Sequence, residues 1–216
     1  MSSVEAVVFD LDGVIVDSEQ VWDDVREQYT RESGGVYTEN ATRDMMGMSS
    51  TEWSRYMAEE LGVPGTPDEI NAAVVERMLE RYGEEPPLIP GAVEAVRRIG
   101  ARWPLAIASS SNPELIRVVL EATGLGQLFR AAVSSQEVAR GKPAPDVYLE
   151  AARRLDVPPA RCGAVEDSHN GIRSAKAAGM RVVAVPNPHF PPDAEALALA
   201  DAVVASTAEL RIEDFE

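Results

Sequence analysis

The sequence predicts an α/β protein: a doubly wound parallel sheet of the Rossmann-like kind, interrupted by one all-helical insertion. Short apolar runs of strand length recur along the 216 residues, and segments of helical periodicity alternate with them. Nearly continuous apolar runs are typical of strands that are buried on both faces of a parallel sheet. Residues 18–89 break the alternation, because this stretch contains helical patterns and no convincing strand.

Six apolar runs are expected to form strands, and they lie at 4–9, 105–109, 131–135, 163–167, 181–185 and 202–205. The helices expected between them have recognisable ends. Asn112 and Pro113 suit an N-cap and a first helical residue, and Gly124 is placed to end that helix. Gly179 ends a second helical stripe. Since strands and helices alternate, the helices are expected to cover both faces of the sheet.

The insertion is predicted to contain three amphipathic helices. The first begins at Asp17–Ser18, with Gln20 in the position of a capping partner, and the third opens with a capping box from Thr66 to Glu69 and ends at Gly83. Their apolar faces comprise, in chain order, Trp22, Val25 and Tyr29, then Trp53, Met57 and Leu61, then Ile70, Val74, Met78 and Tyr82.

Two units follow from this pattern: a core of residues 1–17 and 90–216, and a helical cap of residues 18–89. The formal charge is −16, from 20 basic and 36 acidic residues, which argues against a nucleic-acid partner or an anionic membrane. A single cysteine, Cys162, cannot form an internal disulfide. With no targeting or membrane-spanning run, we expect a soluble cytoplasmic protein, a monomer or small homo-oligomer.

Polar side chains are predicted to converge at the carboxyl edge of the sheet, where open parallel sheets bind ligands. Asp10 and Asp12 follow the first strand, Ser109 ends the second, and Glu166 and Asp167 follow a later one. A lone D-x-D followed by glycine is more often a turn, so the joint placement of two acidic pairs carries the prediction. Clustered carboxylates repel one another unless a cation compensates, and hard oxygen ligands suit Mg²⁺.

Lysine usage singles out Lys142, in the loop Gly141-Lys142-Pro143. The chain contains 18 arginines and only two lysines, the other being Lys176 within a helical pattern. Lysine is a compact point charge on a flexible stem, unlike the rigid fork of arginine. We therefore expect Lys142 to offset negative charge among the carboxylates, and we expect Lys176 to face solvent.

These residues resemble the four ordered motifs of the haloacid dehalogenase superfamily. The motif residues are Asp10-Leu11-Asp12-Gly13-Val14, then Ser109, then Lys142-Pro143, then Glu166-Asp167-Ser168 with Asn170-Gly171. The insertion after the first motif looks like the small helical cap of that superfamily, and the β-phosphoglucomutase-like and sugar-phosphate phosphatase branch is the most similar.

The resemblance implies a role for each motif residue. Asp10 would attack phosphorus to form an aspartyl-phosphate, and Asp12 would protonate the leaving alcohol and then activate water. Ser109 and the backbone N–H of Ser110 would hold the transferring phosphoryl oxygens. The same resemblance implies that Mg²⁺ is held by Asp10, the backbone carbonyl of Asp12, Asp167 and Glu166, the last directly or through water. Lys142 would offset charge on the nucleophile and the phosphate.

The residues that this chain has or lacks at particular positions help to distinguish among the activities of this superfamily. The acid at Asp12 favours phosphoryl transfer over dehalogenation, and an insertion without lysine argues against phosphonate hydrolysis through an imine. A β-phosphoglucomutase-type mutase stays an alternative, although Trp22 occupies the place of its cap histidine and the loop 45–50 contains no cation. We favour a phosphatase acting on a small sugar or polyol phosphate. Candidate substrate contacts are Trp22, Arg43, Gly47, Ser49, Ser110 and Asn112.

A second class of function also fits clustered aspartates. A phospho-accepting signalling domain, or a metal-binding module, gathers aspartates, a hydroxyl and a lysine at the same sheet edge without turnover, although neither needs a cap of this size. The cap has sixteen acidic residues and six arginines, a balance of −10. This charge is expected to disfavour a bulky polyanionic substrate and to admit a small, mostly neutral body with one phosphate.

Overall fold

The computed structural model describes residues 3–45, 48–84, 86–188 and 191–216. Its core is a six-stranded, all-parallel sheet with the order β3-β2-β1-β4-β5-β6, so β1 lies inside the sheet between β2 and β4. The strands are β1 (Ala6–Phe9), β2 (Leu105–Ser109), β3 (Phe129–Ser134), β4 (Cys162–Glu166), β5 (Arg181–Ala184) and β6 (Ala202–Val203). The predicted doubly wound class is confirmed, and each predicted strand is present with shifts of a few residues at its ends.

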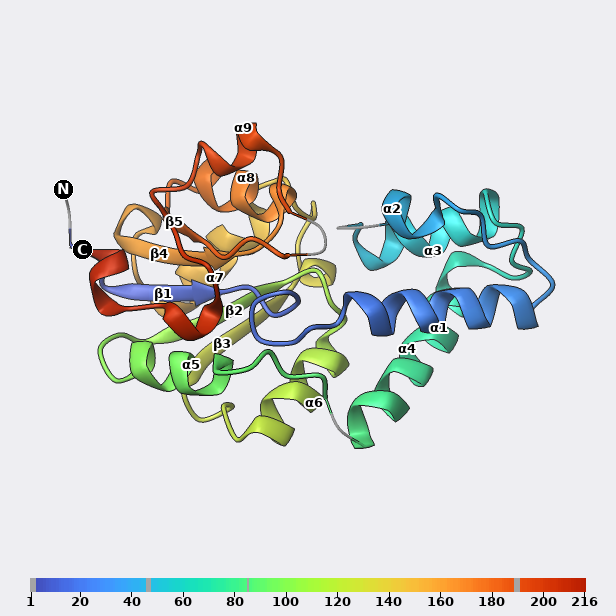
Figure 1. Ribbon diagram of the computed structural model, residues 1–216, viewed down its shortest axis with the longest axis horizontal. Coiled ribbons are helices and arrows are strands. Elements are labelled where there is room, and N and C mark those ends of the chain that lie inside the picture. Colours follow the sequence, from blue (N-terminus) through green and yellow to red (C-terminus); the bar gives the residue numbers. More distant parts are fainter. Residues whose placement is uncertain (1–2, 46–47, 85, 189–190) are drawn as a thin grey trace.

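Helices cover both faces of the sheet (Figure 1). Side chains alternate across β1: Val7 and Phe9 pack in one apolar cluster, and Ala6 and Val8 pack in the other. Helices α5 (Ala92–Gly100) and α6 (Pro113–Thr123) contribute to the first cluster. Helices α7 (Asp146–Leu155) and α8 (His169–Ala177) contribute to the second, and α9 (Ala194–Leu197) packs beside α8.

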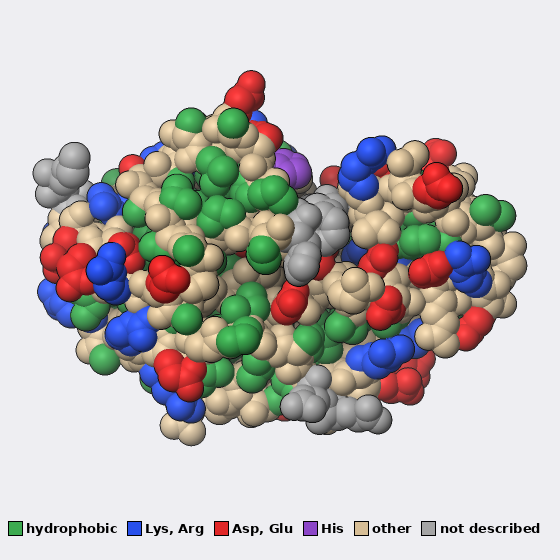
Figure 2. Space-filling model, viewed as in Figure 1, with side chains coloured by type: hydrophobic (Ala, Val, Ile, Leu, Met, Phe, Trp, Pro, Cys, Tyr) green, Lys and Arg blue, Asp and Glu red, His purple; other side chains and the backbone are tan. Residues whose placement is uncertain are grey.

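The insertion between β1 and α5 contains four described helices, one more than the sequence pattern predicts. They are α1 (Glu19–Glu32), α2 (Ala41–Met45), α3 (Ser50–Glu59) and α4 (Pro67–Glu84). The additional helix, α2, has only five residues, too few for a visible period of 3.6. Figure 1 shows the four helices beyond the carboxyl end of β1, and Figure 2 shows charged side chains of both signs on their outer surface.

Two expected helix caps have different outcomes. Thr66 and Glu69 form the predicted capping box, in which the backbone N–H of each residue donates to the side chain of the other. The capping pair predicted for α1 is wrong, because Gln20 donates to Asp24 and the N-cap Ser18 makes no side-chain cap. The Ser18 hydroxyl donates to Asp12 instead.

Two short segments connect the core to the insertion, and they pair with each other. Val16 and Leu88 form an isolated antiparallel bridge, and the N–H of Asp17 donates to the Pro87 carbonyl. Entry and exit therefore lie side by side, next to the end of β1. Among the described residues, no helix combines the length and the apolar character needed to cross a membrane.

Candidate active site

Asp10 lies directly after β1, and its carboxylate is held by two donors. Its N–H continues the sheet ladder by donating to the Val165 carbonyl of β4. Its Oδ1 accepts from the Leu11 N–H at 2.8 Å and lies 3.0 Å from Lys142 Nζ. Within the described part of the chain, Oδ2 accepts no hydrogen bond. The carboxylate is thus fixed through one oxygen, and the other is available for a new bond.

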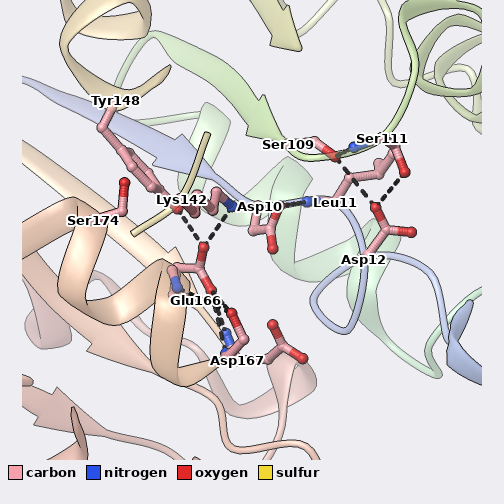
Figure 3. Close-up of polar contacts among 12 residues, drawn as sticks. Asp10, Leu11, Asp12, Ser109, Ser111, Lys142, Tyr148, Glu166, Asp167 and Ser174 are labelled. Carbon is pink, nitrogen blue, oxygen red and sulfur yellow. Dashed lines mark hydrogen bonds and ion pairs between the residues drawn. The ribbon is translucent and has the colours of Figure 1, made fainter. Parts of the chain in front are cut away.

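Lys142 bridges the two acidic motifs (Figure 3). Its Nζ lies 3.0 Å from Asp10 and 2.6 Å from Glu166, and only 3% of the side chain is exposed. The ammonium also lies 5.2 Å from the ring centre of Tyr148. Burial alone would lower the pKa of Lys142, but the two carboxylates outweigh it and raise that pKa above its ordinary value. Lys142 therefore stays charged and offsets part of the acidic cluster.

Glu166 ends β4 and is completely buried, with both carboxylate oxygens engaged. Oε1 accepts from Lys142 Nζ at 2.6 Å and from the Tyr148 hydroxyl at 2.8 Å. Oε2 accepts from the N–H groups of Asp167 and Ser168 and from the Ser168 hydroxyl, at 3.1 to 3.3 Å. Five donors surround this carboxylate, and one of them is the Lys142 ammonium. Glu166 therefore holds Lys142 in place.

Three carboxylates converge on one point. Oxygens of Asp10, Glu166 and Asp167 lie within 4.8 Å of one another, and all three residues are buried. Burial, together with repulsion by neighbouring carboxylates, raises the pKa of Asp10 and of Asp167 well above the ordinary value. Two glycines make room for this approach, since a Cβ at Gly13 would overlap the Asp167 carboxylate and one at Gly171 would overlap that of Glu166.

Asp12 faces a set of hydroxyl groups on the other side of Asp10 (Figure 3). Its Oδ1 accepts from the Ser18 hydroxyl, and its Oδ2 accepts from Ser111 at 2.7 Å and from Ser109 at 3.2 Å. Ser18 begins the insertion, whereas Ser109 ends β2 in the core and Ser111 follows it. The Asp12 carboxylate is therefore oriented jointly by the core and by the N-cap residue of α1.

A pocket lies between the core and the insertion. Residues from both contribute to its lining, which comprises Asp10, Asp12, Ser18, Glu19, Trp22, Arg26, Met45, Met48, Trp53, Ser110, Ser111, Lys142, Asp167, Ser168, His169, Asn170 and Asn187. Three carboxylates and a lysine come from the core, and the two tryptophans, the two methionines, Glu19 and Arg26 come from the insertion. The arrangement suits a ligand whose charged end meets the core and whose body meets a mostly apolar wall.

The structure brings together every residue expected to do chemistry: Asp10, Asp12, Ser109, Lys142, Glu166 and Asp167. Two of the expected substrate contacts, Trp22 and Ser110, line the pocket. Ser109 is completely buried and does not line it; its hydroxyl donates to Asp12 and accepts from the Ser111 N–H.

Three other expected substrate contacts lie elsewhere. Arg43 does not line the pocket; it is 74% exposed and pairs with its neighbour Asp44. Ser49 caps α3 through Glu52. Asn112 bonds to Ser50 and to Asn71, so it ties α6 to the insertion. Gly47 lies outside the described residues.

Sequence reasoning missed Ser111, Tyr148 and Arg26. Ser111 follows the motif serine by two residues, a position where a second hydroxyl could have been noticed. Arg26 lies four residues after Trp22, on the same face of α1, and this spacing was a usable signal. No local pattern indicated Tyr148, because its contact with Glu166 joins α7 to the end of β4, 18 residues further along the chain.

The parallel sheet and the carboxylate cluster at its carboxyl edge define an α/β enzyme of the Rossmann-like class. A family model described as haloacid dehalogenase-like hydrolase matches residues 4–179. The chain therefore belongs to the haloacid dehalogenase-like hydrolase family, which confirms the resemblance in the motifs.

Known relatives span nearly the whole chain. A probable pseudouridine-5'-phosphatase of Drosophila melanogaster is 33% identical, over 100% of this chain and 95% of its own length. Hexitol phosphatase B of Escherichia coli strain K12 is 34% identical, over 97% and 95%. The crystal structure of CbbY from Rhodobacter sphaeroides in complex with phosphate superposes with a TM-score of 0.86 at 28% identity, covering 98% of this chain and 99% of that one.

Replacing Gly171 by alanine tests whether the glycine makes room for Glu166. Alanine inside a helix is worth up to about 1 kcal/mol over glycine, so α8 alone would gain stability. We expect the opposite, since the new Cβ would displace the Glu166 carboxylate and with it Lys142. Chemical denaturation should show a lower free energy of unfolding for Gly171→Ala.

Gly83 supplies the matched control. It lies in α4, and a Cβ there would meet nothing within 4 Å. Gly83→Ala should raise the free energy of unfolding by up to about 1 kcal/mol. Equal stabilisation by both substitutions would show that Gly171 does not hold space for Glu166.

Proposed function

We propose that the protein is a phosphatase that hydrolyses a small phosphate monoester through an aspartyl-phosphate on Asp10. One observation carries this proposal: Asp10, held through Oδ1 with Oδ2 unengaged, lies in a pocket with a second aspartate, Asp12, and a bridging lysine, Lys142. Membership of a hydrolase family whose relatives include named phosphatases supports it.

The residues fit a divalent cation. When Asp10, Glu166 and Asp167 are ionised, Lys142 offsets one of three buried charges, and the remaining two repel each other. Carboxylate oxygens are the ligands that Mg²⁺ prefers. Asp10 and Asp167 would hold the ion directly, and Glu166, whose oxygens already accept five donors, would reach it through water. Bound Mg²⁺ would supply charge neutralisation for the phosphate oxygens.

The chemical steps follow from the positions of the two aspartates. Attack of Asp10 on phosphorus forms an acyl-phosphate as the bond to the leaving oxygen breaks, and Asp12 gives that oxygen a proton. Asp12 then takes a proton from the water that attacks phosphorus, which frees Asp10 and inorganic phosphate. Ser110 and Lys142 would contact the phosphoryl oxygens. The hydroxyls of Ser18, Ser109 and Ser111 hold Asp12 in place between these steps.

A sugar or polyol phosphate is the substrate class that we propose. Two relatives are named as phosphatases of hexitol phosphates and of pseudouridine 5'-phosphate, and the leaving group of each of these substrates is a sugar alcohol or contains a sugar. In this chain Trp22 and Trp53 form an aromatic wall, with ring centres 5.8 Å apart. The apolar surface that these residues contribute suits the carbon skeleton of a sugar, and Glu19, which also lines the pocket, offers an acceptor for hydroxyls.

Replacing Asp10 by asparagine tests the nucleophile. We expect release of inorganic phosphate from sugar phosphates to fall by about a thousandfold or more, because the amide cannot form the acyl-phosphate. Asp156→Asn, the same change at an exposed surface position, should leave the rate unaltered.

The same assay separates the alternatives. Retained activity in Asp10→Asn would contradict the mechanism, and absence of turnover with every phosphate ester would favour a signalling or metal-binding module. Transfer of the phosphoryl group to a second sugar, in place of release to water, would favour the mutase.

Replacing Asp167 by asparagine tests the metal site without an activity readout. Mg²⁺ at a hundredfold above its Kd should stabilise the wild type by about 2.7 kcal/mol, which corresponds to a Tm increase of roughly 5 °C or more. Asp167→Asn should lose most of this increase.

Without Mg²⁺, the substitution Asp167→Asn should not lower the Tm. The Tm of the metal-free variant should equal or exceed that of the metal-free wild type, because one buried, repelled carboxylate is removed. An equal Mg²⁺-induced shift in both proteins would exclude Asp167 as a ligand.

Residues 18–89 are proposed to act as a lid on the core formed by residues 1–17 and 90–216. The paired connecting segments lie beside each other, as a hinge requires, and the pocket lies between the two parts. The contacts of Asn112 with α3 and α4 would then belong to the closed state. Adding Mg²⁺ and a phosphate analogue should lower the radius of gyration in solution scattering, and an unchanged profile would contradict lid motion.

A further inference from the structure

Arg26 extends from α1 into the pocket and is the basic residue that the insertion contributes to the described lining. Its guanidinium carbon lies 4.7 Å from the ring centre of Trp22 and 5.0 Å from that of Trp53. Two aromatic rings thus restrict the guanidinium within the part of the lining that the insertion contributes. Such contacts stabilise an arginine cation without using its N–H donors.

The donors of Arg26 have no partner in the described part of the chain. Its Nε is buried and makes no hydrogen bond, and no described carboxylate lies within ion-pair distance of the guanidinium. A buried donor that stays unsatisfied destabilises a protein, and a buried cation without a counterion does so more strongly. In a pocket wall, a ligand is the natural partner for such a group.

Two acidic residues of α1, Glu19 and Asp23, lie near Arg26. Asp23 Oδ1 accepts from the hydroxyls of Tyr37 and Thr42. Glu19 also lines the pocket, and burial together with the nearby Asp12 raises the pKa of its carboxyl. Among the described residues, neither Asp23 nor Glu19 forms an ion pair or a hydrogen bond with the guanidinium.

We propose that Arg26 is a specificity-determining residue that binds a second anionic group, a carboxylate or a second phosphate, on the leaving group of the substrate. The inference rests on the proposed phosphatase function and deepens it. The fork of a guanidinium matches two oxygens of a carboxylate or a phosphate, and the tryptophans hold that fork in a fixed plane. This proposal departs from the expectation from net charge that the substrate body is mostly neutral.

The test compares three esters of one six-carbon chain that differ in the group at the end away from the shared phosphate. Glucitol 6-phosphate and gluconate 6-phosphate share a carbon chain, but one ends in an alcohol and the other in a carboxylate; glucitol 1,6-bisphosphate supplies the second-phosphate arm. We expect the wild-type kcat/KM to be about tenfold or more higher for at least one of the two doubly anionic esters than for glucitol 6-phosphate. The arm that shows the preference identifies the anion.

Arg26→Met removes the charge and keeps most of the stem. The preference should disappear in this variant, mainly through a higher KM for the doubly anionic ester, while kcat/KM for glucitol 6-phosphate changes by less than about threefold. Arg26→Lys should retain part of the preference, and it serves as a second variant if Arg26→Met does not fold. Arg31→Met, on the exposed face of the same helix, should behave as the wild type.

The outcomes separate this inference from the function on which it rests. A purely structural role for Arg26 predicts equal losses for all three esters, and that result would overturn the inference. A wild type that prefers glucitol 6-phosphate would also overturn it, with the phosphatase function intact. Failure to hydrolyse any of the esters would overturn the proposed function itself.

Discussion

The ion pairs of Lys142 with Asp10 and Glu166 are the interactions on which the site depends. Buried carboxylates without a counterion would take up protons or destabilise the fold, because each loses its hydration. Lys142 lies within 3.0 Å of one carboxylate and 2.6 Å of the other, so it permits two acidic strand ends to be neighbours. One lysine cannot neutralise three carboxylates, however. The remaining charge is the physical reason why the site suits a divalent cation.

Sheet topology supplies the neighbours. Because β1 pairs with both β2 and β4, the residues at the carboxyl ends of these three strands meet at one edge: Asp10 after β1, Ser109 at the end of β2 and Glu166 at the end of β4. The insertion leaves the core directly after β1, so its first residue, Ser18, also reaches Asp12. The orientation of one aspartate thus depends on how the insertion meets the core, which links the proposed lid to the proposed proton transfer.

The strands, the two acidic motifs and the lysine were predictable from the sequence, because apolar runs report burial and strand ends report the edge of the sheet. Side-chain partners were less predictable where a residue can either cap its own helix or bond to a distant element. Local rules assign Ser18 and Asn112 to helix caps, but their side chains bond to Asp12 and to the insertion instead. The expectation for Arg43 and Ser49 rests only on their position in the insertion. The packing of the insertion on the core shows that neither residue lines the pocket.

Net charge is also a poor guide to the pocket. Of the sixteen acidic residues in the insertion, Glu19 alone lies in the described lining, and Arg26 of the same helix lies there too. The remaining acidic groups act on a ligand across solvent, where physiological salt screens interactions beyond about 8 Å. They can slow the approach of an anion, but they do not decide which anion the pocket retains. That selection depends on the few charges that line the pocket, and among them Arg26 is a cation with a buried donor that no described residue satisfies.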